Sequence, residues 1–198
     1  MLGLAYLAGS VSTGVIVARL MRLPDPRETG SKNPGATNVL RSGGKKAAAF
    51  TLGGDVLKGF IPVFIAGLLA NPQTSYAAMS AAAIGAFLGH LLPVFFRFQG
   101  GKGVATAAGA MLALAPLIAL ASIALWLFIA YTTRVSSLAA IFSAIAASAL
   151  ATIFAAPELG FTISMIALML ILRHFGNIKR LINGEEPRIG ESSSPRDS

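Results

Sequence analysis

The sequence has no cysteine among its 198 residues, and only 12% of them are charged. Without cysteine the chain forms no disulfides, no thiolate-bound metal sites and no cysteine nucleophile. Its two histidines and eight carboxylates show no metal-ligand spacing such as HExxH, so we expect neither a metal site nor a cofactor. The charged fraction is about half that of an ordinary soluble domain, and 55% of the residues are hydrophobic, which predicts a membrane protein.

A net charge of +8 raises the question of a nucleic-acid partner. However, the basic residues occur in short groups between apolar runs, and no basic face is interleaved with aromatic residues. We therefore expect no nucleic-acid partner. No polar segment is long enough to build a core of its own, so any chemistry must lie among loops and helix ends at the membrane surface.

The apolar runs predict an all-α, polytopic integral membrane protein with about seven transmembrane helices. Five expected spans are residues 2–20, 48–70, 77–96, 137–155 and 161–172, the last of which continues as a polar helix to residue 182. Between residues 102 and 134 we expect two short or tilted helices, or a re-entrant pair, hinged near Pro116. Six spans are the alternative if the Pro116 pair is parsed differently. Residues 23–46, rich in proline and glycine, predict a structured cytoplasmic loop and not a helix.

The lysines and arginines all fall in segments that this topology places at or inside one membrane boundary. Because positive residues favour the cytoplasmic side, the N-terminus is expected outside and the C-terminus in the cytoplasm. Residues 1–183 are expected to form a single transmembrane catalytic domain. Residues 184–198 are rich in serine, proline and charge, which predicts a partly disordered cytoplasmic tail.

Four ionisable residues lie within or beside apolar runs, where burial makes them costly and therefore candidates for function: Asp55, His90, Arg173 and His174. Each also has a structural interpretation. Asp55 and Lys58 are three residues apart and can form an ion pair on one helix face. His90 can bond a carbonyl near the following proline, and Arg173 can extend its charge to the interface. His174 can belong to a polar helix face that is simply solvated, since Arg173, Asn177 and Arg180 are spaced i, i+4 and i+7 and predict such a face at the membrane boundary.

The segment Phe95–Gly103 reads FFRFQGGKG, where an apolar run ends in glycines around Lys102. Glycine allows backbone N–H groups to approach a ligand, and lysine supplies a point charge suited to phosphate. The segment is not a Walker A loop, because Gly103 follows the lysine where serine or threonine is required. A flexible turn on the cytoplasmic side is the alternative.

Four ordered motifs carry a family resemblance: Gly9-Ser10, Gly30-Ser31-x-Asn33-x-Gly35-Ala36-Thr37-Asn38, Gly89-His90-x-x-Pro93 leading to Gly100-Gly101-Lys102-Gly103, and Arg173-His174-x-x-Asn177-Ile178-x-Arg180 with Glu186. This set resembles the bacterial acyl-phosphate-dependent glycerol-3-phosphate acyltransferase family over nearly the whole chain. The resemblance implies a seven-helix enzyme of the inner membrane with its active site at the cytoplasmic face. Such an enzyme transfers a fatty acyl group from acyl phosphate to the 1-hydroxyl of glycerol 3-phosphate, giving lysophosphatidic acid and phosphate.

The resemblance implies the partners and the site. The partners are glycerol 3-phosphate, a long-chain acyl phosphate and the lipid bilayer, while docking of the soluble enzyme that forms acyl phosphate stays open. The implied catalytic residues are His174, Lys102 and Asn177. The implied substrate-binding residues are Ser31, Asn33, Gly35, Thr37, Asn38, Arg41, Gly100, Gly101, Gly103, Ser137, Arg173 and Glu186. Two positions depart from the family pattern: Lys32 replaces a usual glycine, and Gly54 replaces a usual aromatic residue.

Acyl phosphate is already activated, and no serine lies in a GxSxG motif, so direct attack by the acceptor hydroxyl is the expected route. His174 is the best side-chain base, with a substrate phosphate oxygen as the alternative. An acyl-CoA donor is excluded only by the family resemblance. The rival of another class is a small multi-pass carrier for a phosphorylated metabolite. Against it, polar residues gather on one side, and no inverted repeat is evident.

Overall fold

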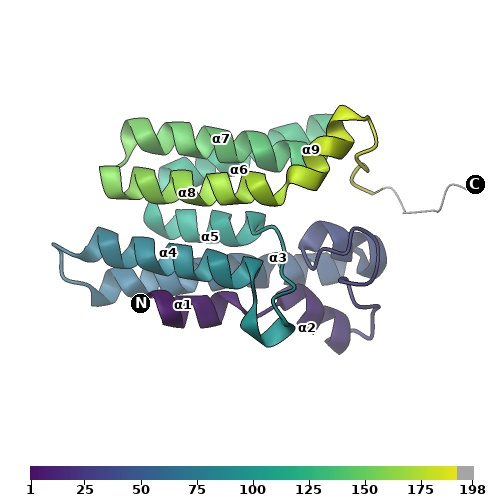
Figure 1. Cartoon of the computed structure of the whole chain (residues 1–198), viewed down its shortest axis with the longest axis horizontal. Coiled ribbons are helices and arrows are strands. Elements are labelled where there is room, and N and C mark those ends of the chain that lie inside the picture. The colour runs from purple at the N-terminus through teal and green to yellow at the C-terminus, as the bar shows by residue number, and fades with distance from the viewer. Residues whose placement is uncertain (191–198) are drawn as a thin grey trace, which may run out of the picture.

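The computed structural model describes residues 1–190, and within that range the regular elements are all helices (Figure 1). In chain order they are α1 (Leu2–Gly9), α2 (Thr13–Leu20), α3 (Ala36–Leu69), α4 (Ser75–Leu91), the short 3₁₀ helix η1 (Val94–Phe96), α5 (Val104–Leu114), α6 (Pro116–Thr133), α7 (Ser136–Phe154), α8 (Pro157–Arg173) and α9 (Phe175–Ile182). The predicted all-α class is confirmed.

Five segments are long and apolar enough to cross a membrane: residues 2–20, α3, residues 75–96, α6 and α7. The bent pair α8 and α9 makes a sixth, and α5 is an apolar helix of 11 residues. The two helices predicted around Pro116 are confirmed, since α6 begins at that proline. The number of crossings and the side of each terminus stay predictions.

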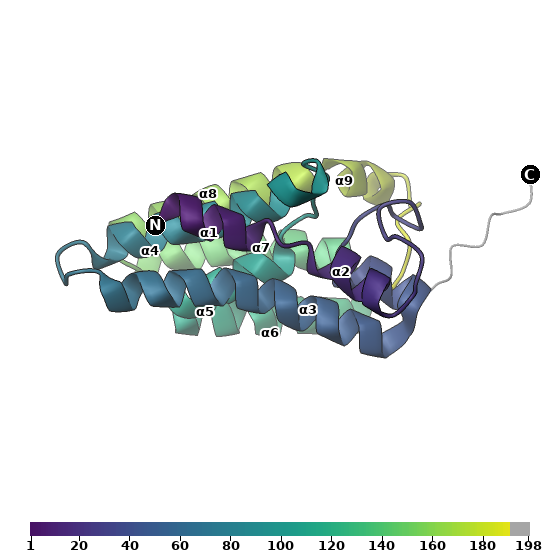
Figure 2. The same ribbon diagram turned by 90° about the horizontal axis from the view of Figure 1, so that it is seen from below.

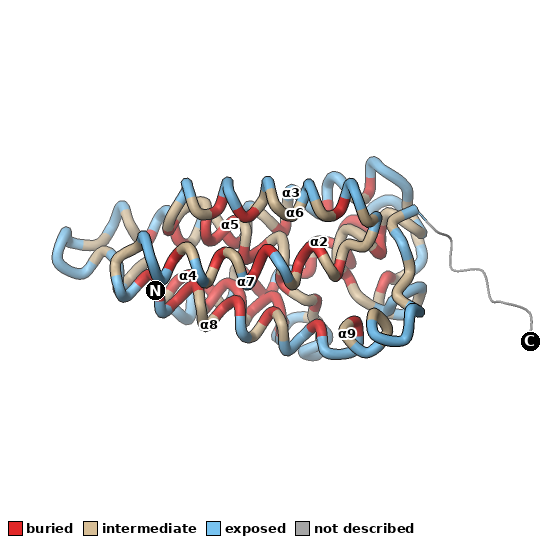
Figure 3. Tube along the Cα trace, turned by 90° about the horizontal axis from the view of Figure 1, so that it is seen from above, coloured by how far each residue is buried: buried red, intermediate tan, exposed pale blue. Residues whose placement is uncertain are grey.

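The helices form two packed groups whose axes follow the long axis of the molecule (Figures 1 and 2). One group contains α1, α3, α4 and α5, and the other contains α6, α7 and α8. The groups meet where α4 packs on α8 and α5 packs on α6. Buried residues line the space between helices, and exposed residues cover the outside and the ends (Figure 3).

Alanine and glycine dominate the packing surfaces, as expected where helices approach closely in a membrane. A Cβ on Gly59 would lie 2.1 Å from the carbonyl oxygen of Thr106, so α3 and α5 meet backbone to backbone. The outside carries large apolar side chains, among them Leu117 at 80% and Phe154 at 75% exposure. Such a surface is compatible with lipid and unfavourable in water.

The loop predicted over residues 23–46 is wrong in its second half, because α3 already begins at Ala36. Gly44 has φ 73° and ψ −177°, so a short first helix turns there into the long apolar one. Only glycine adopts that φ at little cost, and the Gly43–Gly44 pair supplies it. The polar composition of residues 36–46 concealed a helix that lies outside the apolar span.

Two spans predicted as continuous are broken. Residues 2–20 separate into α1 and α2 at Ser10–Ser12, where Nζ of Lys58 donates a hydrogen bond of 2.8 Å to the carbonyl of Val11. Residues 161–182 bend by 57° between α8 and α9, and His174 occupies the break. In both places a polar side chain bonds a carbonyl beside the break, so the chain can leave the helix within an apolar environment.

The described part of the predicted tail, residues 184–190, folds back over the end of the helix bundle. The backbone N–H of Ile189 donates to the carbonyl of Arg134 at 2.7 Å, and the Arg134 side chain donates to the carbonyl of Ile189 at 3.1 Å. Residues 191–198, which share the prediction of disorder, lie outside the described part of the chain. The division into a domain and a tail stays a prediction.

Candidate active site

A cavity of about 630 Å³ is lined by residues of both helix groups. At one end its lining includes Asn177 and Arg180 of α9, the helix labelled at one end of the bundle in Figure 1, and we refer to this end as the mouth. The inner part of the cavity is apolar, with residues that include Ala107, Met111, Trp126, Ala144, Ala147, Ile166 and Leu170. Its outer part is polar. Twelve of the predicted site residues line it: Ser31, Asn33, Gly35, Thr37, Asn38, Arg41, Lys102, Gly103, Ser137, His174, Asn177 and Glu186. Gly100, Gly101 and Arg173 do not.

A hydrogen-bonded chain joins three distant segments at the polar end. Nζ of Lys102 donates to Oδ1 of Asn177 at 2.6 Å, and Nδ2 of Asn177 donates to Oε1 of Glu186 at 2.5 Å. Ser137 and Arg180 donate to the two oxygens of the same carboxylate at 2.7 and 2.8 Å. Asn177 therefore links the glycine loop to the tail residue Glu186 through its amide.

The charges at this end are mainly positive. Burial lowers the pKa of Lys102 to about 8; the carboxylate of Glu186 opposes this effect, while Arg180, Arg173 and Arg41 add to it. Burial alone would raise the pKa of Glu186, but hydrogen bonds from Ser137, Asn177 and Arg180 outweigh it and hold that pKa below its usual value. Four basic side chains, Arg41, Lys45, Lys102 and Arg180, line the cavity against the two carboxylates of Asp55 and Glu186, and this excess of positive charge favours binding of an anion.

His174 lines the cavity with a side chain that is 3% exposed. Its Nδ1 lies 2.8 Å from the carbonyl oxygen of Leu170. Because a carbonyl only accepts hydrogen bonds, Nδ1 must carry the proton. In the neutral ring, Nε2 is then the nitrogen able to accept a proton.

Asn38 braces the first loop. Its Oδ1 accepts the backbone N–H of Ser31 at 3.0 Å, and its Nδ2 donates to the carbonyls of Pro26 and Thr29 at 2.9 and 3.0 Å. Since both ends of the amide are occupied, Asn38 positions Ser31 instead of presenting a free group. Thr37 reaches across the mouth to Ser136 of α7, with 3.2 Å between the hydroxyl oxygens.

The glycine loop is held from two sides. The N–H of Gly101 donates to the carbonyl of His90 at 3.1 Å, and the guanidinium of Arg173 donates to the carbonyl of Gly101 at 3.1 Å. Arg173 therefore neither extends along the interface nor lines the cavity, but fixes the loop that carries Lys102. Gly103 has φ 83°, a conformation that glycine adopts at little cost.

The loop is packed too closely for a larger residue. A Cβ on Gly101 would lie 2.3 Å from Nε2 of His90, so we expect Gly101→Ala to lower the free energy of unfolding by about 1–3 kcal/mol. Thermal unfolding in detergent measures this effect. Gly53→Ala is the matched control, because a Cβ there meets no atom within 4 Å. Equal melting temperatures for the two variants would contradict the packing argument.

Buried polar residues below the loop answer two questions left open by the sequence. Asp55 and Lys58 form the expected ion pair, at 2.9 Å. His90 does not bond a carbonyl through Nδ1; that atom lies 3.0 Å from the hydroxyl of Thr106 and 3.7 Å from Asp55. Asp55 and His90 also line the cavity. The predicted set of site residues omitted Asp55 and His90, although ionisable side chains within or beside apolar runs had marked both as candidates for function.

Arg180 is a third residue that the predicted set of site residues omitted. It lines the cavity and bonds Glu186, and Arg173, Asn177 and Arg180 had shown helical spacing in the sequence. That spacing predicted one polar face, but the bend at His174 separates Arg173 from the other two. Asn177 and Arg180 face the cavity, whereas Arg173 turns to the glycine loop.

Comparison with known proteins identifies the family to which the chain is similar. A model of the family described as glycerol-3-phosphate acyltransferase matches residues 1–184. The chain is 52% identical to the glycerol-3-phosphate acyltransferase of Paraburkholderia phymatum, over 94% of this chain and 90% of that protein. It is 54% identical to that of Ralstonia nicotianae, over 96% and 93%.

Solved structures agree. The glycerol 3-phosphate form of PlsY (YgiH), an integral membrane glycerol 3-phosphate acyltransferase, matches with a TM-score of 0.89 and 40% identity, over 96% of this chain and 94% of that chain. The form described as the lysphosphatidic acid form matches with a TM-score of 0.83 and 39% identity, over 94% and 92%.

Fold and site together define a multi-pass integral membrane protein whose cavity joins an apolar interior to a cationic mouth. The chain belongs to the glycerol-3-phosphate acyltransferase family, and it is an acyltransferase. The resemblance carried by the four sequence motifs is confirmed. The carrier alternative finds no support in the matched proteins.

Proposed function

We propose that the protein transfers a fatty acyl group from an acyl phosphate to the 1-hydroxyl of glycerol 3-phosphate, releasing lysophosphatidic acid and phosphate. The observation that carries this proposal is the chain Lys102–Asn177–Glu186 at the cationic mouth of a cavity that is apolar further in. The glycerol 3-phosphate and lysphosphatidic acid forms of the similar structure support the acceptor and the product.

Both proposed substrates carry a phosphate, and one also carries a long apolar chain. The mouth provides Arg41, Lys45, Lys102 and Arg180 for the two phosphates. The apolar interior between α5, α6, α7 and α8 accommodates the acyl chain. A single cavity therefore offers each part of the donor an environment of matching polarity.

The proposed step is a direct acyl transfer. The 1-hydroxyl oxygen attacks the acyl carbon, a new carbon–oxygen bond forms, and the bond from that carbon to the phosphate oxygen breaks. The hydroxyl proton passes to Nε2 of His174, and phosphate leaves with the bonding electron pair. Holding both substrates in one cavity removes much of the entropic cost of their encounter.

Each polar residue has a distinct proposed role. Lys102, which lines the cavity, stabilises negative charge on the donor. Ser31, Arg41 and Asn177 orient glycerol 3-phosphate, while Glu186 fixes the Asn177 amide from the opposite side. Arg173 and Asn38 position the two loops without contacting substrate.

The pH dependence of catalysis tests the role of Lys102. Its pKa of about 8 means that it is charged below pH 8 and neutral above. Because kcat/KM reports the free enzyme, we expect kcat/KM for glycerol 3-phosphate to fall as the pH rises through about 8. Lys102→Arg should move this fall beyond pH ~10, since arginine stays charged there. A wild-type profile that stays flat over this range would contradict the prediction.

The assignment of the donor is tested with detergent-purified protein and radiolabelled glycerol 3-phosphate. Palmitoyl phosphate and palmitoyl-CoA are supplied in parallel, and label that enters the organic phase is measured. We expect transfer with palmitoyl phosphate alone. Transfer from palmitoyl-CoA, or no transfer from either donor by folded protein, would overturn the proposal.

We also propose that the active site faces the cytoplasm from the bacterial inner membrane. The polar mouth of the cavity lies at the same end of the helices as the basic segment 22–46 and the glycine loop (Figures 1 and 2). This shared position agrees with the positive-inside rule.

A further inference from the structure

A second cavity, also of about 630 Å³, lies outside the active site and shares no lining residue with it. It is formed by the end of α2, the following loop and the segment around η1. Its lining residues are Arg19, Arg27, Glu28, Phe95, Phe96, Arg97 and Gln99. We refer to it as the arginine groove. Three guanidinium groups against one carboxylate make its lining positive.

Two of the three arginines are available to a ligand. The third, Arg27, forms a bidentate ion pair with Asp25, in which Nη2 lies 2.7 Å from Oδ2. Its guanidinium also lies over the ring of Phe96, 5.9 Å from the ring centre. Within residues 1–190, the side chains of Arg19 and Arg97 form no hydrogen bond or ion pair. Both are exposed, and Arg19 lies near enough to Asp25 to help lower the pKa of that carboxyl.

The backbone beside the groove adopts a strained conformation at Arg97 and Phe98. Arg97 and Phe98 are consecutive non-glycine residues with φ of 56° and 59°. Such a conformation costs energy at each residue and is found most often at functional sites. It turns the chain sharply after η1, so that Arg97 lies in the groove while Phe98 is 58% exposed.

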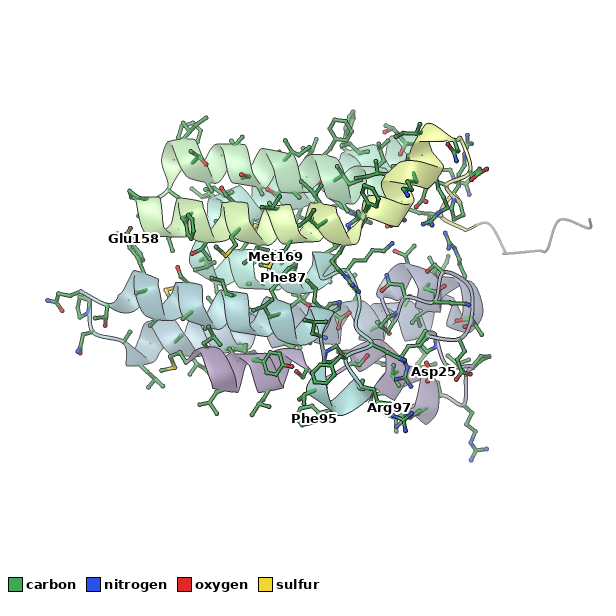
Figure 4. All side chains as sticks on the ribbon, in the orientation of Figure 1. Asp25, Phe87, Phe95, Arg97, Glu158 and Met169 are labelled. Carbon is green, nitrogen blue, oxygen red and sulfur yellow. The ribbon has the colours of Figure 1, made fainter. Side chains whose placement is uncertain are left out.

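Exposed apolar side chains surround the groove. Phe95 is 60% and Leu20 79% exposed, and Figure 4 shows Phe95 and Arg97 side by side on the outer surface, with Asp25 next to them. Phe95 lies at the end of the apolar segment 75–96, and aromatic side chains at the end of a membrane span are typical of the boundary between headgroups and acyl chains. Basic residues at that boundary attract anionic lipids.

We propose that the arginine groove binds the phosphate of an anionic phospholipid, with Arg19 and Arg97 as the ligating side chains and Phe95 and Phe98 against the acyl chains. Charge complementarity and the apolar rim favour a lipid over a free anion, because a free phosphate would leave the aromatic side chains exposed to water. The inference rests on the membrane position of this end of the molecule and does not depend on the acyl-transfer reaction.

The test is native mass spectrometry of the full-length protein in detergent, titrated with phosphatidylglycerol or phosphatidylcholine. We expect wild-type protein to bind phosphatidylglycerol about tenfold more tightly than phosphatidylcholine. The double variant Arg19→Ala/Arg97→Ala should lose this preference. The variant Arg22→Ala/Lys46→Ala removes the same charge from the basic segment outside the groove and should retain it.

Equal binding of the two lipids by wild-type protein would overturn the proposal. A preference that survives in the Arg19/Arg97 variant would also overturn it. Displacement of phosphatidylglycerol by millimolar inorganic phosphate would show that the groove recognises phosphate without lipid. Acyl transfer in detergent, measured on each variant, verifies the fold and separates failure of this proposal from failure of the proposed reaction.

Discussion

Lys102→Ala is expected to lower kcat/KM for glycerol 3-phosphate by about a thousandfold. Lys102 lines the cavity, its ammonium group bonds Asn177, and burial has already reduced the hydration of its charge. Its loss leaves Oδ1 of Asn177 without this donor and removes the cation that the glycine loop itself carries into the cavity. Initial rates with palmitoyl phosphate, measured against the concentration of glycerol 3-phosphate, give this ratio.

Two control variants separate charge from structure. Lys46→Ala removes an exposed lysine that does not line the cavity, and it should leave the rate within twofold or so. Lys102→Arg keeps the charge but changes its shape, and it should retain more activity than alanine. If Lys102→Ala turns over at the wild-type rate, Lys102 has no part in catalysis and the proposed phosphate site must be moved.

His174→Ala is expected to lower kcat by about 10²- to 10⁴-fold, the usual contribution of a positioned general base. The bond from Nδ1 to the Leu170 carbonyl fixes the tautomer, and alanine removes the only ring nitrogen able to take the hydroxyl proton. Because His174 is not proposed to hold either phosphate, KM for glycerol 3-phosphate should change little. Steady-state kinetics with saturating palmitoyl phosphate separate the two constants.

The alternative base is a phosphate oxygen of a substrate. It predicts that His174→Ala loses less than tenfold in kcat while thermal unfolding stays unchanged. His174 lies in the break between α8 and α9, so the variant must be shown to fold before its rate is interpreted.

Much of the helical fold follows from hydropathy alone. Residues 48–70, 77–96 and 137–155 were predicted as spans, and all three lie largely within helices. Hydropathy does not reveal where a helix breaks, because the side chains that hydrogen-bond the carbonyls left free at a break can come from elsewhere in the chain. Lys58 bonds the Val11 carbonyl 47 residues away, and no local pattern predicts that contact.

The candidate site, too, is predicted from the sequence only in part. The motifs selected residues that do meet around one cavity, although Lys102 and Asn177 are 75 residues apart. They did not distinguish groups that face the cavity from groups that support it. Arg173, predicted to bind substrate, does not line the cavity and donates its hydrogen bonds to the glycine loop, whereas Asn38 lines the cavity although its amide is bonded to the backbone of the first loop. That distinction depends on three-dimensional contacts.

The fold-back of residues 185–190 has a practical consequence for how the protein is expressed and labelled. A truncation after residue 184, where the family match ends, would keep every helix of the described residues. It would nevertheless delete Glu186 and the carbonyls of Pro187 and Arg188 that Arg41 contacts at 3.5 Å. Affinity tags and fluorescent fusions should therefore be attached after residue 198 through a flexible linker, so that residues 185–190 keep their contacts at the cavity.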